Sequence, residues 1–220
     1  MLHTVPSLFK QLTRTLKENA TLTSEVSSLK NILLAGEPLY GKDVLDWRQA
    51  AGEGAEIVNL YGPSETTLIK TYYRVSSEIS DPHIMLPVGK PISNTAILII
   101  SDDEMCNVGN SGDIYIKTPF RTKGYYQDAD QTKERFVQNP LNKNGEDILY
   151  KTGDLGRYLK DGNIEFVGRG DSRLRHVLEP TGLVLDGVRD DAYGEAGRAV
   201  EACPRIPVVG ADLQGGQLAV

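Results

Sequence analysis

The sequence predicts an α/β fold, followed by a β-rich, barrel-like subdomain and an atypical C-terminal tail. Residues 1–70 alternate apolar stretches of helical and strand spacing, whereas residues 71–171 contain short β-rich runs separated by turns. The composition then changes abruptly. Alternating helices and strands favour a mostly parallel sheet, and successive short strands favour antiparallel pairing. We therefore expect a partial α/β segment (1–70), a β-rich segment (71–171) and a divergent tail of unknown fold (172–220).

The opening residues predict a helix and then a buried strand. Pro6 suits the first turn of the helix. The apolar residues of one helical face repeat at the expected spacing: Val5, Leu8, Phe9, Leu12 and Leu16. The run Leu29–Ala35 is apolar and ends at Gly36, which is typical of a buried strand.

A second helix and a second strand complete this alternation. Pro38 is placed to begin the helix, which would carry Leu39, Val44, Leu45 and Trp47. Glu56–Tyr61 is again an apolar strand, and it runs into Gly62 and Pro63. The pattern of helix, strand, helix and strand predicts a mostly parallel sheet.

The middle of the chain predicts several short strands and one helix. The β-rich runs are Thr71–Val75, Thr95–Ser101, Asp113–Thr118 and Asn163–Val167. Clusters of Gly, Asn and Asp separate them, and Lys160–Asn163 has the composition of a hairpin turn. Asp130–Phe136 is the expected helical insert.

The overall composition is that of an ordinary soluble globular protein, with 40% apolar and 25% charged residues. The net charge of −6 argues against nucleic acid and anionic membranes, because both attract clustered Lys and Arg. Cys106 and Cys203 stand far apart, so we expect neither a metal site nor a disulfide framework from them. The sequence offers no signal peptide and no bilayer-spanning stretch, which favours a cytoplasmic location.

The segment Asn59–Thr67 (NLYGPSETT) is the first candidate for chemistry. It follows a strand, so its polar side chains would gather at the carboxyl edge of a sheet, where α/β folds bind ligands. An aromatic ring can pack on a flat base, a hydroxyl can contact phosphate, and a carboxylate can hold Mg²⁺. For Tyr-Gly-Pro alone, a simple polar turn explains the pattern better, whereas the nine residues together favour a ligand site.

The segment Tyr150–Asp171 (YKTGDLGRYLKDGNIEFVGRGD) is the second candidate. It reads as two small β units joined by Gly turns. Asp154 follows Thr152 and Gly153, and a buried carboxylate is a common way to hold a ribose diol. Taken alone, the Thr-Gly-Asp triplet favours a purely structural turn.

Together, these segments resemble the adenylation domains of nonribosomal peptide synthetases, within the adenylate-forming, AMP-binding superfamily. The resemblance runs from about Val5 to Arg173. The matching stretches occur in order: LLAGEPL, NLYGPSETT, PVGKPISNT, GDIYIKTPFRTKGYY, QTKERFVQNP and YKTGDLGRYLKDGNIEFVGR. GKPISNT and TKERFVQNP favour the peptide-synthetase branch over generic acyl-CoA ligases, which remain an alternative.

The resemblance implies a nucleotide site for ATP or AMP with Mg²⁺. It places Tyr61 against the adenine, Ser64 on phosphate and Glu65 on the metal. It places Asp154 on the ribose hydroxyls and Arg169 near the ribose or phosphate. These roles come from the family pattern and not from the spacing of the residues.

The resemblance also implies a reaction and a hinge. The family joins a carboxylate, usually of an amino acid, to AMP and then passes the acyl group to a phosphopantetheine thiol on a peptidyl carrier domain. Asp171 corresponds to the hinge between the family's large and small domains. No catalytic residue is assigned in this chain.

Five apolar residues fall where the family lines its amino-acid pocket: Leu33, Ala35, Leu60, Leu68 and Ile69. They favour an apolar or aromatic substrate side chain, because a charged one would lose its hydration without a partner. Alternatively, these residues are simply core residues at strand ends.

Three departures from the family pattern lead us to expect a fragment that is inactive alone. The family's phosphate loop has no counterpart, and the match stops after Arg173. Lys, Asn and Ser are absent beyond Ser172, so no lysine is available for the family's C-terminal catalytic position. A shifted reading frame or chimeric joining explains the tail better than an added domain. The alternatives are an enzyme completed by a partner chain and a non-catalytic nucleotide-binding or interaction module.

Overall fold

The computed structural model describes residues 1–142 and 144–170. The expected hinge residue Asp171 and the segment 172–220 lie outside the described residues. Within the described part of the chain, no helix is both long and apolar enough to cross a membrane.

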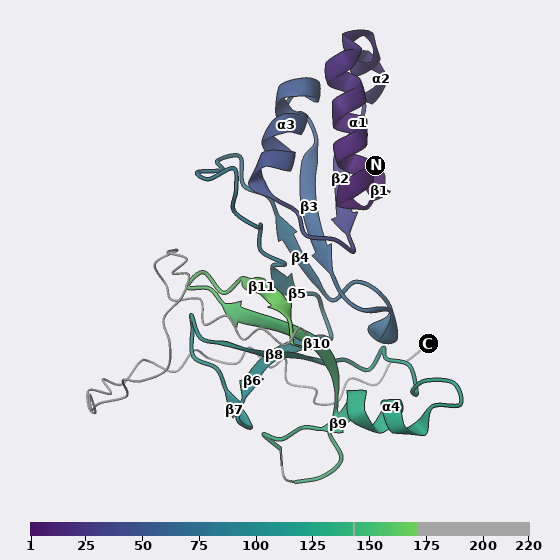
Figure 1. The fold of residues 1–220 in the computed structure, drawn as a ribbon, viewed down its shortest axis with the longest axis vertical. Coiled ribbons are helices and arrows are strands. Elements are labelled where there is room, and N and C mark those ends of the chain that lie inside the picture. Colours follow the sequence, from purple (N-terminus) through teal and green to yellow (C-terminus); the bar gives the residue numbers. More distant parts are fainter. Residues whose placement is uncertain (143, 171–220) are drawn as a thin grey trace, which may run out of the picture. The chain divides into compact units, whose positions relative to one another are not determined.

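The first half of the described chain forms a mixed, five-stranded sheet with helices on one face (Figure 1). Its strand order is β1-β2-β3-β4-β5, with β1, β2 and β3 parallel and the remaining pairs antiparallel. The strands are β1 (Leu2–Thr4), β2 (Asn31–Ala35), β3 (Glu56–Tyr61), β4 (Thr71–Arg74) and β5 (Lys90–Pro91). The helices are α1 (Pro6–Glu18), α2 (Thr23–Val26) and α3 (Gly41–Ala51), with 3₁₀ turns at Ala20–Leu22 and Ser64–Thr66.

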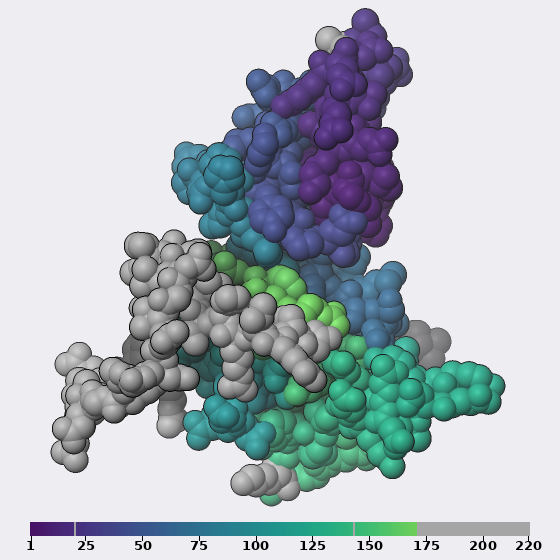
Figure 2. Space-filling model, viewed as in Figure 1, coloured from purple at the N-terminus to yellow at the C-terminus, as the bar shows by residue number. Residues whose placement is uncertain are grey.

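Helices α1 and α3 cover the same face of this sheet. Ile32 and Leu34 alternate with Leu33 along β2, so they point to the helical side. There they meet Phe9 of α1 and Trp47 of α3, whose rings lie 5.1 Å apart between centroids. Figure 2 shows α1 and α3, in purple and blue, at the outer surface of this part of the molecule. The helices therefore cover one face of the sheet. The ends of the strands are left available to form a binding site.

The predicted alternation of helices and strands is confirmed, with one difference in where a helix begins. Helix α3 begins at Gly41, three residues after the expected start at Pro38. The intervening segment pairs instead with another part of the chain, because the main-chain N–H of Leu86 donates to the carbonyl of Leu39 at 2.8 Å. The main-chain N–H of Gly41 donates in turn to Ile84. The bridge between Tyr40 and Met85 belongs to the same pairing, which places the segment before Gly41 outside the helix.

The second half forms an antiparallel, curled sheet, as the sequence predicts. Its strand order is β11-β10-β8-β6-β7, and β9 pairs with β10. Its elements are β6 (Ala96–Ser101), β7 (Glu104–Met105), β8 (Ser111–Lys117), α4 (Ala129–Arg135), β9 (Phe136–Gln138), β10 (Ile148–Tyr158) and β11 (Ile164–Arg169). The run at Thr71, expected to begin this β-rich part, instead pairs with β3 in the first sheet.

Strand β10 contains an irregularity that shapes the site. Lys151 pairs with Tyr115 of β8, and the next paired residue of β10 is Leu155. Residues 152–154 therefore bulge out of the ladder. Gly153 adopts a φ of +79°, which glycine tolerates better than other residues. Bulges of this kind redirect side chains, and here the residue redirected is Asp154.

Candidate functional site

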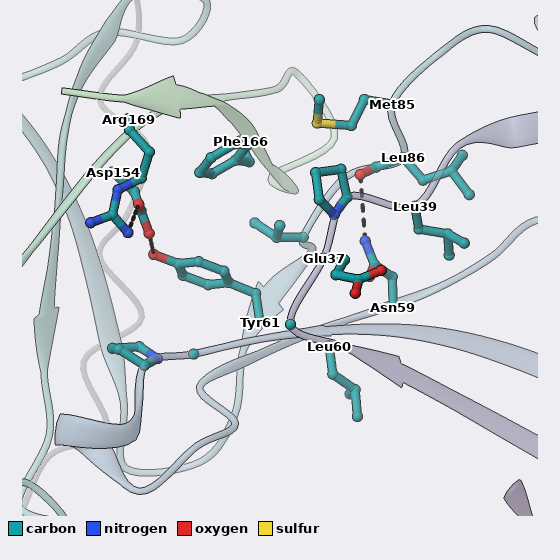
Figure 3. Close-up of a pocket in the computed structure, with 15 residues that line it drawn as sticks. Glu37, Leu39, Asn59, Leu60, Tyr61, Met85, Leu86, Asp154, Phe166 and Arg169 are labelled. Carbon is teal, nitrogen blue, oxygen red and sulfur yellow. Dashed lines mark hydrogen bonds and ion pairs between the residues drawn. The ribbon is translucent and has the colours of Figure 1, made fainter. Parts of the chain in front are cut away.

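A cavity of about 320 Å³ lies where β3 ends and β10 and β11 approach it (Figure 3). Its wall comes from five separate stretches of the sequence. The lining residues are Gly36, Glu37, Pro38, Leu39, Asn59, Leu60, Tyr61, Gly62, Pro63, Met85, Leu86, Val88, Asp154, Phe166 and Arg169. Three of the four residues predicted to contact nucleotide, Tyr61, Asp154 and Arg169, are therefore brought together at one cavity.

Tyr61 and Asp154 form the polar centre of this cavity. The Tyr61 hydroxyl donates a hydrogen bond to Oδ2 of Asp154 at 2.6 Å. Asp154 is only 7% exposed. Burial, followed by the negative charge of Asp154, raises the pKa of Tyr61, so the phenol stays protonated and acts as the donor.

Arg169 approaches the same carboxylate from the neighbouring strand. It is paired with Asp154 in the β10–β11 ladder, and its Nη1 lies 3.1 Å from Oδ1 of Asp154. The Arg169 side chain is 56% exposed, so it also reaches solvent. A carboxylate offers about four lone-pair positions, so Asp154 can accept hydrogen bonds from several donors at once.

The bulge in β10 holds Asp154 in place. Its main-chain N–H donates to the hydroxyl of Thr152 at 3.0 Å. That hydroxyl donates in turn to the carbonyl of Ile114 in β8 at 2.8 Å. The carbonyl therefore has a hydrogen-bond partner where the pairing of β8 and β10 is interrupted. On the other side of the bulge, the main-chain N–H of Gly170 donates to the carbonyl of Gly153 at 2.8 Å. Asp154 therefore projects from a well-bonded segment.

Gly62 lets the chain turn back beside Tyr61. A Cβ atom at this position would come within 1.8 Å of the Leu68 carbonyl oxygen and 2.7 Å of the Lys70 nitrogen. The main-chain N–H of Lys70 donates to the Tyr61 carbonyl at 2.7 Å. Only glycine permits this close approach, so Gly62 fixes the end of β3 at the cavity.

Asn59 and Phe166 are cavity residues to which sequence reasoning assigned no role. Asn59 is 4% exposed, and its amide nitrogen donates to the Pro87 carbonyl at 2.8 Å. The available signal was a polar residue inside an apolar strand, because buried amides need partners. Phe166 lines the cavity from β11, and nothing in its local sequence distinguishes it from a core residue.

Glu37 lines the cavity and also anchors α1. Its carboxylate accepts hydrogen bonds from the main-chain N–H of Ser7 at 2.8 Å and from the Ser7 hydroxyl at 2.9 Å. Ser7 lies in the first turn of α1, where free N–H groups and the helix dipole favour a negative charge. The loop after β2 is thereby tied to the helix that covers the sheet.

Ser64 and Glu65 lie in the 3₁₀ turn after Pro63 and do not line the cavity. Ser64 is exposed, whereas Glu65 is half-buried and accepts a hydrogen bond from the Tyr125 hydroxyl at 2.6 Å. Burial acts to raise the pKa of Glu65, but hydrogen bonds, first from Tyr125, outweigh it and lower that pKa. Within residues 1–142 and 144–170, no group of three or more His, Cys, Asp or Glu side chains is arranged to hold a metal.

The five residues predicted for an amino-acid pocket separate into two groups. Ala35 and Leu60 are paired across β2 and β3, and Leu33 lies on the same face of β2. Of the five, only Leu60 lines the cavity, and Figure 3 shows its side chain pointing away from Asn59 and Tyr61. Leu68 and Ile69 lie in the loop after the 3₁₀ turn, and Leu68 is 62% exposed.

Known proteins related to this chain point to one family. Residues 1–126 match the family model described as AMP-binding enzyme. The chain is 34% identical over 172 residues to tyrocidine synthase 2 of Brevibacillus parabrevis, covering 78% of this chain and 4% of that protein. It is 38% identical over 151 residues to surfactin synthase subunit 3 of Bacillus subtilis (strain 168), covering 68% of this chain and 12% of that protein. The chain thus spans a small part of the length of these relatives.

Solved structures agree with the sequence comparison. PA1221, a nonribosomal peptide synthetase protein containing adenylation and PCP domains, superposes with a TM-score of 0.65 at 28% identity. That match covers 77% of this chain and 33% of PA1221. The nonribosomal peptide synthetase FmoA3 gives a TM-score of 0.68 at 26% identity, covering 76% of this chain and 18% of FmoA3. The chain belongs to the AMP-binding enzyme family, and it corresponds to part of an adenylation domain of the nonribosomal peptide synthetase type.

Proposed function

We propose that this chain binds the nucleoside part of ATP or AMP in the cavity beside Tyr61. The observation that carries the proposal is the convergence of Tyr61, Asp154 and Arg169 on one cavity. Its volume of about 320 Å³ lies at the lower end of the ~300–1,000 Å³ common for small-ligand sites. The aromatic side chains of the wall suit a base, and the buried carboxylate suits a ribose. The partly exposed guanidinium suits a phosphate.

Each group has a distinct task in this proposal. The rings of Tyr61 and Phe166 offer flat apolar surface to the adenine. Asp154 accepts hydrogen bonds from the ribose hydroxyls, as buried acidic residues do in dinucleotide-binding folds. Arg169, which reaches solvent, pairs with the α-phosphate, because a guanidinium is a strong donor to phosphate oxygens. Ser64, exposed after Pro63, is proposed as a further phosphate contact.

The proposed reaction is ATP-dependent adenylation of an amino acid or other carboxylate in nonribosomal peptide biosynthesis. Attack of the carboxylate on the α-phosphate would give an acyl-adenylate and pyrophosphate. The phosphopantetheine thiol of a carrier domain would then attack the acyl carbon, lose its proton, form a thioester and release AMP. PA1221 combines adenylation and PCP domains, which supports a carrier partner. The shared face of Leu33, Ala35 and Leu60 supports an apolar substrate side chain.

Glu65 is the proposed ligand for Mg²⁺. Mg²⁺ is usually bound by one or two carboxylates together with phosphate oxygens and water, so a single carboxylate beside a nucleotide fits that donor set. When bound, the metal would neutralise phosphate charge. The residues of this chain would hold the nucleoside and orient its α-phosphate.

Calorimetric titration with AMP tests the nucleotide proposal. We expect saturable binding that Arg169→Gln weakens for AMP but leaves nearly unchanged for adenosine, which lacks the phosphate. Arg14→Gln, at an exposed position of α1, is the matched control and should bind both ligands as the original chain does. A folded chain that takes up neither AMP nor adenosine would refute the proposal.

A pyrophosphate-exchange assay with a panel of amino acids tests the reaction separately. From the sequence we expect no exchange by this chain alone. Exchange with an apolar amino acid would instead demonstrate an active adenylating enzyme and identify its substrate class.

A further inference from the structure

The carboxylate of Glu65 is held by side chains from two other regions of the chain. The Tyr125 hydroxyl donates to Oε1 of Glu65 at 2.6 Å, although 60 positions separate the two residues. The Tyr150 hydroxyl lies 3.3 Å from that of Tyr125, and Tyr150 is 4% exposed. The carboxylate therefore has a defined direction, which a freely rotating surface glutamate would lack.

Tyr125 is itself fixed by α4 and its flanks. Its main-chain N–H donates to the Thr132 hydroxyl at 2.9 Å, and that hydroxyl donates to the Asp128 carbonyl at 2.7 Å. Phe136 packs edge-on against the Tyr125 ring, with centroids 6.1 Å apart. Its ring is tilted against that of Tyr150, with centroids 5.1 Å apart. These contacts restrict the phenol before any ligand arrives, so little conformational freedom remains to be lost.

The turn that carries Glu65 is also tied to the loop before Tyr125 by main-chain contacts. The main-chain N–H of Thr122 donates to the Glu65 carbonyl at 2.8 Å. The hydroxyl of Thr67 donates to the Phe120 carbonyl at 3.1 Å. These bonds do not involve the Tyr125 hydroxyl, so a Tyr125→Phe variant keeps the turn attached and loses only the contact to the carboxylate.

We infer that Tyr125, supported by Tyr150, is a positioning residue that aims the Glu65 carboxylate at a divalent cation on the nucleotide's phosphates. The inference rests on the proposed nucleotide-binding function. A carboxylate has two oxygens, so the bond from Tyr125 to Oε1 is compatible with a cation at Oε2. Hydrogen bonds to a metal-ligating group fix its orientation, and their loss costs about 10–100-fold in metal affinity.

Mn²⁺ serves as a spectroscopic probe because its EPR signal falls when the ion leaves the aqueous state for a protein site. The titration uses the whole chain saturated with a nonhydrolysable ATP analogue, and the nucleotide's own binding of Mn²⁺ is subtracted. We expect Tyr125→Phe to weaken the protein-dependent Mn²⁺ affinity about tenfold. Tyr126→Phe, a neighbouring residue that is 90% exposed, should change the affinity less than twofold. Equal affinities for these two variants would overturn the inference.

Two further variants separate positioning from a general loss of structure. Glu65→Gln should weaken the protein-dependent Mn²⁺ affinity more than Tyr125→Phe does, and the double variant should bind Mn²⁺ as Glu65→Gln does, because the phenol acts through Glu65. Should Tyr125→Phe fail to fold, Tyr150→Phe retains the direct bond and should weaken Mn²⁺ about threefold. Unchanged Mn²⁺ binding in a folded Tyr150→Phe variant would then contradict the support assigned to Tyr150.

AMP binding distinguishes this inference from the function on which it rests. AMP lacks the β- and γ-phosphates, so its affinity should be the same in Tyr125→Phe and in the original chain. Failure of the original chain to bind AMP refutes the nucleotide proposal. The absence of Mn²⁺ binding that depends on Glu65 overturns the positioning inference, whether or not AMP binds.

Discussion

The hydroxyl of Tyr61 lies 2.6 Å from the carboxylate of Asp154, although 93 positions separate these residues in the sequence. Tyr61 ends β3 in the first sheet, and Asp154 lies in the bulge of β10 in the second. One hydrogen bond therefore joins two sheets at the wall of the cavity. The same bond satisfies a carboxylate that is 7% exposed, so it has consequences for stability as well as for binding.

Replacing Tyr61 with phenylalanine should destabilise the fold. The variant keeps the ring but removes a donor to a buried carboxylate, and such a loss costs about 1–3 kcal/mol. Urea unfolding followed by circular dichroism measures the change. Tyr126→Phe, at a position that is 90% exposed, should alter the free energy of unfolding by less than about 0.5 kcal/mol. Equal stabilities of the two variants would show that the Tyr61 hydroxyl contributes nothing.

Replacing Gly62 with alanine should lower the free energy of unfolding by at least about 1–3 kcal/mol. The added methyl group would lie 1.8 Å from the Leu68 carbonyl oxygen, so the main chain would have to move. Urea unfolding again provides the measurement. Gly54→Ala is the matched control, because a Cβ there meets nothing within 4 Å. A Gly62→Ala variant as stable as Gly54→Ala would contradict the folded-back geometry of this loop.

Asp147 should make stability depend on acid pH. Burial acts to raise its pKa, but hydrogen bonds from Lys117, Asn139 and Asn142 outweigh burial and lower it. A carboxyl group with a lowered pKa stabilises the fold above its ordinary pKa of about 3.9 and loses that contribution as the pH falls toward the folded value. The Asp147→Asn variant should therefore be less stable than the original chain at pH 7, by about 1–3 kcal/mol.

The stability difference between the original chain and Asp147→Asn should depend on pH. The difference between the original chain and Asp147→Asn should narrow as the pH falls below about 4, because the carboxyl group is then protonated first in the unfolded chain and, at its lower pKa, in the folded chain. Urea unfolding at pH 7 and pH 3 tests this, with the exposed Asp103→Asn as the control. A difference that is the same at both pH values would contradict the role assigned to the charge.

Local patterns predicted most of the elements but not their long-range partners. The apolar repeat from Val5 to Leu16 predicted α1, because an amphipathic helix buries one face. Phe9 and Leu16 of that repeat are buried, whereas Leu8 is 58% exposed. The start of α3 was misplaced, since Leu39 pairs with Leu86 and this contact leaves no local signature. Strand β4 was assigned to the wrong sheet for the same reason, because its partner β3 is separated from it by a turn with no regular hairpin signal.

The candidate site was predictable only through the family resemblance. No spacing rule links Tyr61 to Asp154, and their meeting depends on the bulge in β10. Asn59 carried a local signal as a polar residue in an apolar strand, whereas Phe166 carried none. Tyr125 was also missed, because its link to Glu65 depends on how α4 packs. The roles assigned to the predicted site residues all remain predictions: Tyr61, Ser64, Glu65, Asp154, Arg169, Asp171 and the five residues of the amino-acid pocket.

We propose above that Asp154 recognises the ribose of a nucleotide held beside Tyr61. Calorimetric titration of the original chain and of Asp154→Asn, each with AMP and with 2′,3′-dideoxy-AMP, tests it most directly. We predict that Asp154→Asn weakens AMP binding about 10–100-fold, because hydrogen bonds to a charged group are lost. Its affinity for dideoxy-AMP should match that of the original chain, and Asp103→Asn should behave as the original chain with both ligands. An equal loss for AMP and dideoxy-AMP, or no loss for either, would contradict the claim.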